Sequence, residues 1–217
     1  MFMPTLTHVR TVMDAKKYKY FQGHYNINLI GIRTECSESN KFDDTFIVSY
    51  QSRQKEFILG FPCTTDPGKK YLLNPLAGTG GTLIMVPGQY RAAYELGIHG
   101  RSKPKEKQYE ALEQVKDICY VRDKSRDSVI DFNLYRGADR PVNIFWDNCK
   151  SNIHRGNSGW LSKVKGQHLV DGHSAGCQVL QYSDDFTVLL SLVRKSIAVW
   201  GNGFTYTLLE ERDFLLV

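Results

Sequence analysis

The chain of 217 residues carries 28 Lys and Arg against 23 Asp and Glu, and 41% of its residues are hydrophobic. This length fits one domain, or one domain with a small appendage. The hydrophobic content supports a sizeable core and excludes wholesale disorder. A net charge of +5 is too small for a dedicated nucleic-acid-binding protein, although it allows weak attraction to polyanions such as anionic cell-wall polymers.

The chain ends and the cysteines bear on where the protein works. The first twenty residues lack the apolar stretch of a signal peptide. The chain also contains no run of about 18 apolar residues, so no membrane span is predicted. We therefore expect synthesis in the cytoplasm, no membrane partner, and delivery by other means if the protein acts outside. The five cysteines form no CxxC pair and no disulfide framework is expected; they are Cys36, Cys63, Cys119, Cys149 and Cys177.

Alternating polar and apolar residues predict a chain made mostly of strands. Residues 1–24 are expected to be an irregular N-terminal arm, followed by one domain over 25–217. Strands are predicted over 25–33, 42–50, 55–61, 82–86, 89–96, 113–122, 129–134 and 204–209. Residues 51–54 suggest a hairpin turn, and the charged stretch 100–108 a solvated surface loop.

Only residues 186–200 have helical spacing over a long stretch. Their apolar positions form one face of an amphipathic helix, namely Phe186, Leu189, Leu190, Val193 and Ile197. Ser183, Asp184 and Asp185 are suited to cap its start, and Gly201 to end it. The predicted fold class is mainly β with one long C-terminal helix, an α+β protein.

Residues 151–181 hold the strongest combination of reactive side chains. Cys177 follows Ser174-Ala175-Gly176, and His154 lies at the end of an earlier strand. A thiol attacks as its thiolate, and an imidazole can take its proton. Gly176 permits a sharp turn that presents main-chain N–H groups to an oxyanion. The plainer alternative is a buried cysteine after a glycine turn, with a surface histidine.

These residues resemble a known family. The pair I-H-x-G and S-x-G-C-x-V, with Val86-Pro87-Gly88-Gln89-Tyr90 and 61–68 upstream, is similar to the L,D-transpeptidase (YkuD-like) catalytic domain over roughly residues 45–182. The resemblance implies a β-sandwich or barrel and a thioester acyl-enzyme formed on peptidoglycan stem peptides, without a cofactor. It also implies Cys177 as nucleophile, His154 as base and later acid, Ser174 as turn residue, and the Gly176 and Cys177 N–H groups facing the oxyanion.

Other residues are expected to line the substrate groove. The family's histidine before Gly-Cys is Ala175 here, with His173 two residues earlier. His99, in a second I-H-G, is a rival for the base role but is placed with the groove residues, as is Arg155. Trp160 lies in the loop before Cys177, where it lines the groove or anchors the loop.

Metal and nucleotide sites find little support. Asp123, Ser125, Asp127 and Asp131 occupy four positions of a calcium-loop pattern, but Ser128 replaces its glycine and Leu134 its glutamate. A polar turn is therefore favoured over a calcium site, and no metal is expected. There is no GxxxxGK[ST] or GxGxxG motif for nucleotides.

The leading expectation is a cysteine-dependent peptidoglycan-active enzyme that cleaves or transfers L,D-peptide bonds. The missing leader suits a phage lysin, a virion component or another delivered protein, which makes virion or delivery proteins possible partners. Two alternatives stay open: a non-catalytic structural or wall-binding protein that keeps the fold, and another cysteine peptidase or acyltransferase with a protein substrate.

Overall fold

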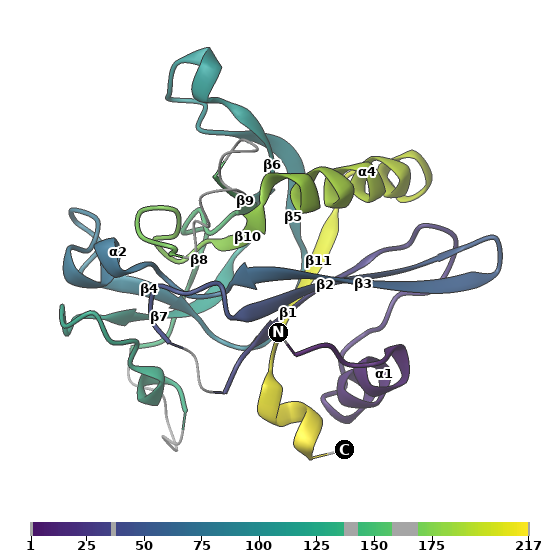
Figure 1. Ribbon diagram of the computed structural model, residues 1–217, viewed down its shortest axis with the longest axis horizontal. Helices are drawn as coiled ribbons and strands as arrows, with labels where there is room; N and C mark the ends of the chain where they lie inside the picture. The colour runs from purple at the N-terminus through teal and green to yellow at the C-terminus, as the bar shows by residue number, and fades with distance from the viewer. Residues whose placement is uncertain (1, 36–37, 137–142, 158–168, 217) are drawn as a thin grey trace.

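Eight strands close into a barrel in the computed structural model, which describes residues 2–35, 38–136, 143–157 and 169–216 (Figure 1). The order around the barrel is β1 (Asn28–Arg33), β11 (Phe204–Glu210), β5 (Gly88–His99), β6 (Tyr109–Gln114), β9 (Ile153–Asn157), β10 (Gln178–Tyr182), β3 (Lys55–Thr64) and β2 (Asp44–Ser52). The β1–β11 and β9–β10 pairs are parallel, and the other neighbours are antiparallel. The mainly β prediction is confirmed.

A smaller antiparallel sheet stands beside the barrel, in the order β4 (Thr82–Met85), β7 (Ile118–Asp123) and β8 (Phe145–Asp147). It has its own small core, formed by Leu72, Ile84, Val121 and Ile130. The short helices are α2 (Lys69–Leu73) and the 3-10 turns η1 (Lys105–Lys107), η2 (Phe132–Leu134) and η3 (Glu211–Leu215).

Several local predictions are confirmed in the hairpins. The turn between β2 and β3 has Arg53 at φ 48° and Gln54 at φ 62°, the two left-handed residues of a tight hairpin. The charged stretch 100–108 forms the tip of the β5–β6 hairpin and projects away from the barrel (Figure 1).

The predicted C-terminal helix is present as α4 (Ser183–Trp200), which packs on β9 and β10. Its apolar face joins the main core through Phe186, Leu189, Leu190 and Val193. Gly201 ends the helix at φ 84°, as predicted. The predicted cap at Ser183 is wrong, because the N-cap residue is Tyr182 and its side chain makes no capping hydrogen bond. Asp184 and Asp185 lie in the first turn instead, where their negative charges interact favourably with the helix dipole.

Three segment predictions are wrong. The expected irregular arm contains helix α1 (Leu6–Ala15), whose Thr5 cap accepts a hydrogen bond from the His8 N–H at 3.2 Å. Residues 113–122 are not one extended segment, because a turn separates β6 from β7. Residues 129–134 form no strand and end in η2.

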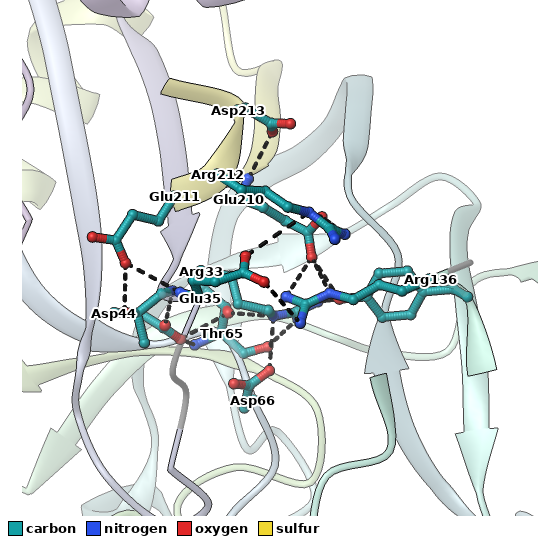
Figure 2. A network of polar contacts seen from close by, with 12 residues as sticks. Arg33, Glu35, Asp44, Thr65, Asp66, Arg136, Glu210, Glu211, Arg212 and Asp213 are labelled. Carbon is teal, nitrogen blue, oxygen red and sulfur yellow. Dashed lines mark hydrogen bonds and ion pairs between the residues drawn. The ribbon is translucent and has the colours of Figure 1, made fainter. Parts of the chain in front are cut away.

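A network of polar contacts surrounds the buried Arg33 side chain (Figure 2). Arg33, at the end of β1, is fully buried and pairs with Asp66 at 2.9 Å. It also donates to the Met85 carbonyl on β4 at 2.9 Å and to the Tyr135 hydroxyl at 2.8 Å. One side chain therefore connects the barrel to β4 and to the segment after η2.

The network continues through Asp44 and Glu210 (Figure 2). Asp44 accepts from the N–H groups of Thr34 at 2.8 Å and Thr65 at 2.7 Å. Burial and the neighbouring Asp66 raise the pKa of Asp44 to about 8. Glu210 pairs with Arg136 at 2.6 Å. Acidic and basic side chains are thus paired with each other throughout this network.

Among the described residues, no helix combines the length and the apolar character needed to cross a bilayer.

Candidate functional site

The parallel pairing of β9 and β10 places Cys177 and His154 on neighbouring segments of the barrel wall. In this register Gln178 lies beside Ile153 and Val179 beside His154, so Cys177, just before β10, lies beside Asn152. A two-residue offset between adjacent strands corresponds to Cα atoms about 8 Å apart. The Cys177 sulfur lies 3.8 Å from the carbonyl oxygen of Lys150, which precedes Asn152 in the chain.

The turn before Cys177 is built around the Ser174 hydroxyl. Ser174 is fully buried and donates to the Cys177 carbonyl at 2.8 Å, while it accepts from the Gly176 N–H at 3.1 Å. Gly176 has φ +122°, and a Cβ there would lie 2.7 Å from the Cβ of Leu83, so only glycine fits. Ser174 and Gly176 thus shape the turn before Cys177. The Gly176 N–H, expected to face an oxyanion, donates to the Ser174 hydroxyl in this structure, and the oxyanion roles stay predictions.

Cys177 is half-buried, with its sulfur 3.8 Å from the Lys150 carbonyl. Burial raises the pKa of the thiol to about 11, since an apolar environment disfavours the charged thiolate. The resting side chain is therefore a neutral thiol.

His154 is buried, and its contacts identify its tautomer. Its Nδ1 lies 2.8 Å from the Arg155 carbonyl and 3.2 Å from the Tyr109 hydroxyl. A carbonyl can only accept, so Nδ1 carries the proton and Nε2 keeps a free lone pair. Burial first, and then His99, lower the pKa of His154 to about 3. The imidazole is therefore neutral at physiological pH and able to accept a proton.

His99 packs directly on this base. The two imidazole rings stack with centroids 4.7 Å apart and an interplanar angle of 29°. Asn152 Nδ2 lies 3.3 Å from His99 Nδ1, and the Tyr109 ring packs against His99 with centroids 5.1 Å apart. The sequence did not point to Asn152 or Tyr109. Asn152 lies two residues before His154, and this spacing in an extended segment could have indicated that it belongs to the same site.

The remaining candidates for the substrate groove are His173, Arg155 and Trp160. His173 is half-buried and close enough to lower the pKa of His154. Arg155 places its guanidinium 4.4 Å over the Tyr109 ring. Trp160 lies outside the described residues. That these side chains line a substrate groove stays a prediction.

The calcium-loop pattern forms a polar turn in which the chain's own donors engage the carboxylates. Asp123 Oδ1 accepts from the Ser125 N–H at 2.9 Å and hydroxyl at 2.7 Å. Asp127 accepts from the Val129 N–H at 2.9 Å, and Asp131 from the Asn133 N–H at 3.0 Å. Over the described ranges, no three His, Cys, Asp or Glu side chains gather in a way that could hold a metal ion.

Comparisons of the chain with protein-family models, curated proteins and solved structures found no match.

Proposed function

We propose that the protein is a cysteine-dependent enzyme that cleaves or transfers L,D-peptide bonds of peptidoglycan stem peptides. One observation supports this most: the parallel β9–β10 register places Cys177, just before β10, beside Asn152, two residues from His154. A nucleophile and its base must be within side-chain reach, and the base must be oriented by a third group. The Arg155 carbonyl provides that orientation at His154 Nδ1.

The covalent step follows from the neutral pair. His154 Nε2 takes the thiol proton as the Cys177 sulfur attacks the scissile carbonyl carbon. The C–N bond then breaks, the leaving amine takes the proton from the imidazolium, and a thioester remains on Cys177. Water releases a shortened stem, whereas an amine acceptor forms a new peptide bond and gives a cross-link. Both outcomes use the same two side chains and need no cofactor.

The substrate class comes from the resemblance of the I-H-x-G and S-x-G-C segments to L,D-transpeptidases. We propose that the enzyme reaches the cell wall after delivery, as a phage lysin or a virion component, with virion or delivery proteins as its partners. The net charge of +5 suits approach to an anionic wall.

Replacing Cys177 with alanine tests the proposal. Purified stem peptides and muropeptides are incubated with the full chain, and products are followed by mass spectrometry. We expect Cys177→Ala to reduce turnover to background and His154→Gln to lower kcat by about 10²- to 10⁴-fold. Cys149→Ala, at another half-buried thiol, is the matched control and should keep wild-type turnover. Unchanged turnover in Cys177→Ala would exclude the mechanism.

A second function, a non-catalytic structural or wall-binding virion protein, is favoured by one observation. The raised pKa of Cys177, to about 11, differs from the lowered values of many catalytic thiols. The rate of alkylation distinguishes the two functions. If the protein is an enzyme, His154→Gln should slow iodoacetamide modification of Cys177 at pH 7, whereas in a structural protein the substitution should have no effect.

A third possibility, a cysteine peptidase or acyltransferase with a protein substrate, uses the same pair. Digests of purified peptidoglycan, compared with digests of a peptide library, distinguish it from the leading proposal.

A further inference from the structure

Asn152 connects the strands that carry the candidate site. Its side-chain oxygen accepts from the Gln114 N–H of β6 at 2.9 Å, and its backbone carbonyl accepts from the Gln178 N–H, next to Cys177, at 2.9 Å. Because the oxygen faces a donor, the amide orientation is determined and the NH₂ group faces His99 Nδ1. Asn152 is itself buried, so this arrangement is held in place.

The amide contact decides the charge of His99. An NH₂ group can only donate, so His99 Nδ1 must keep its lone pair. Protonation would put an N–H against the NH₂ of Asn152. The ring that stacks on His154 is therefore neutral. A neutral aromatic face attracts a cation, whereas a second imidazolium at the same distance would repel it.

We propose that His99 is a positioning residue, which Asn152 holds neutral so that its ring supports the positive charge formed on His154 when Cys177 is deprotonated. This inference rests on the proposed function, because the charge forms only when His154 acts as a base. It moves His99 from the substrate groove to the catalytic base and gives Asn152 a function.

Burial and several charged groups act on the two rings. Burial first, and then Lys103, lower the pKa of His99, whereas Glu113 raises it. On the His154 side, His173 and Lys103 also lower the pKa. Tyr109 is a neutral phenol, whose pKa burial raises to about 12 against the opposing effect of Arg155. The carboxylate named among these neighbours, Glu113, acts on His99, and at His154 the hydrogen bond to the Arg155 carbonyl raises the pKa against the other effects.

Substitution of Asn152 by aspartate removes the NH₂ group that faces His99 and keeps an oxygen at the Gln114 N–H. One oxygen of the introduced carboxylate can still accept from the Gln114 N–H, but the other now favours a protonated His99. We expect Asn152→Asp to raise the pKa of His99 in an NMR titration. We also expect kcat/KM on stem peptides to fall about tenfold as the pH drops below that raised pKa. The wild type should show no such fall over the same range.

Two variants at position 99 complete the test. His99→Phe keeps a stacking ring that cannot titrate and should stay within about threefold of the wild type, whereas His99→Ala should lose about tenfold. The double variant Asn152→Asp/His99→Phe should lose the new acidic limb. If the fall of kcat/KM at low pH persists in the double variant, the introduced carboxylate acts directly on His154 and the proposal is overturned. Equal losses of activity in His99→Phe and His99→Ala would also overturn it.

The alkylation rate of Cys177 by iodoacetamide gives a second readout that needs no substrate. Measured at one fixed pH below the raised pKa of His99, it should rank the four variants in the same order as kcat/KM, because it also depends on transfer of the thiol proton to His154. If Cys177→Ala leaves peptide turnover intact, the proposed function fails. If that variant is inactive but Asn152→Asp behaves like the wild type in both assays, only the role of His99 fails.

Discussion

At the scale of single residues, burial shifts the pKa values of the candidate residues Cys177 and His154 in opposite directions. Burial raises the pKa of Cys177 to about 11 and lowers that of His154 to about 3. Both changes favour the neutral forms, so the resting state is a thiol beside an imidazole and not an ion pair. Reactivity then depends on proton transfer during attack.

The pH dependence of Cys177 modification follows from this neutral pair. The thiolate fraction should rise about tenfold per pH unit from pH 7 toward the thiol pKa near 11, and the alkylation rate should rise with it. Peptide mapping by mass spectrometry after timed iodoacetamide treatment measures the rate at Cys177 and, for comparison, at another half-buried thiol, Cys149. A rate that levels off below pH 8 would show a stabilised thiolate and contradict the neutral pair.

At the scale of elements, the barrel has two packing layers. Helix α4 covers the main core, and helix α1 covers the opposite side of β1, β2 and β11 (Figure 1). Val9, Val12 and Met13 of α1 pack there with Ile30 and Ile47, among others. The first residues of the chain are thus part of the packed structure, although they lie far from Cys177.

Met13→Ala should measure how much α1 contributes to stability. Met13 is 1% exposed, and truncation of a buried methionine costs about 2–5 kcal/mol of unfolding free energy. Urea denaturation of the full chain provides the measurement. Asp14→Ala, at an exposed neighbour on the same helix, should change stability by less than about 0.5 kcal/mol. Equal effects from the two substitutions would mean that α1 does not pack on the barrel.

At the scale of the whole molecule, the Arg33 network joins the barrel to the smaller sheet (Figure 2). It contains two buried carboxylates, Asp44 and Asp66, around one buried guanidinium. Removal of the cation would leave both carboxylates without their main compensation, which is far more costly than loss of a surface pair.

Arg33→Met should therefore destabilise the protein by about 3–5 kcal/mol. Arg194→Met, which breaks the exposed Arg194–Glu110 pair, should cost about 1 kcal/mol or less. The pKa of Asp44 is raised above its unfolded value, so its contribution to stability is present at low pH and is lost as pH rises toward 8. The loss in Arg33→Met should accordingly be larger at pH 8 than at pH 5. A loss independent of pH would exclude charged carboxylates as its cause.

Local patterns were enough for much of the fold. The hairpin at 51–54, the helix ending at Gly201 and the strand over 204–209 were predicted from residue type and spacing, and the structure confirms them. These features depend on turn geometry and on the period of apolar side chains, which neighbouring residues determine. The strand predicted over 129–134 is wrong, because a 3-10 turn over Phe132–Leu134 forms there and Asp131 caps it by accepting from the Asn133 N–H.

The sequence by itself determined that the chain is mainly β, which local hydrophobic alternation is able to do, and it singled out Cys177, His154, Ser174 and Gly176. Only the tertiary structure decided that β9 and β10 run parallel as neighbours, that His99 stacks on His154 and Asn152 contacts His99, and that the Gly176 N–H is already bound. Strand pairing joins residues distant in the chain, and no local pattern encodes which strands will meet. Burial and charge at a side chain likewise depend on those distant neighbours.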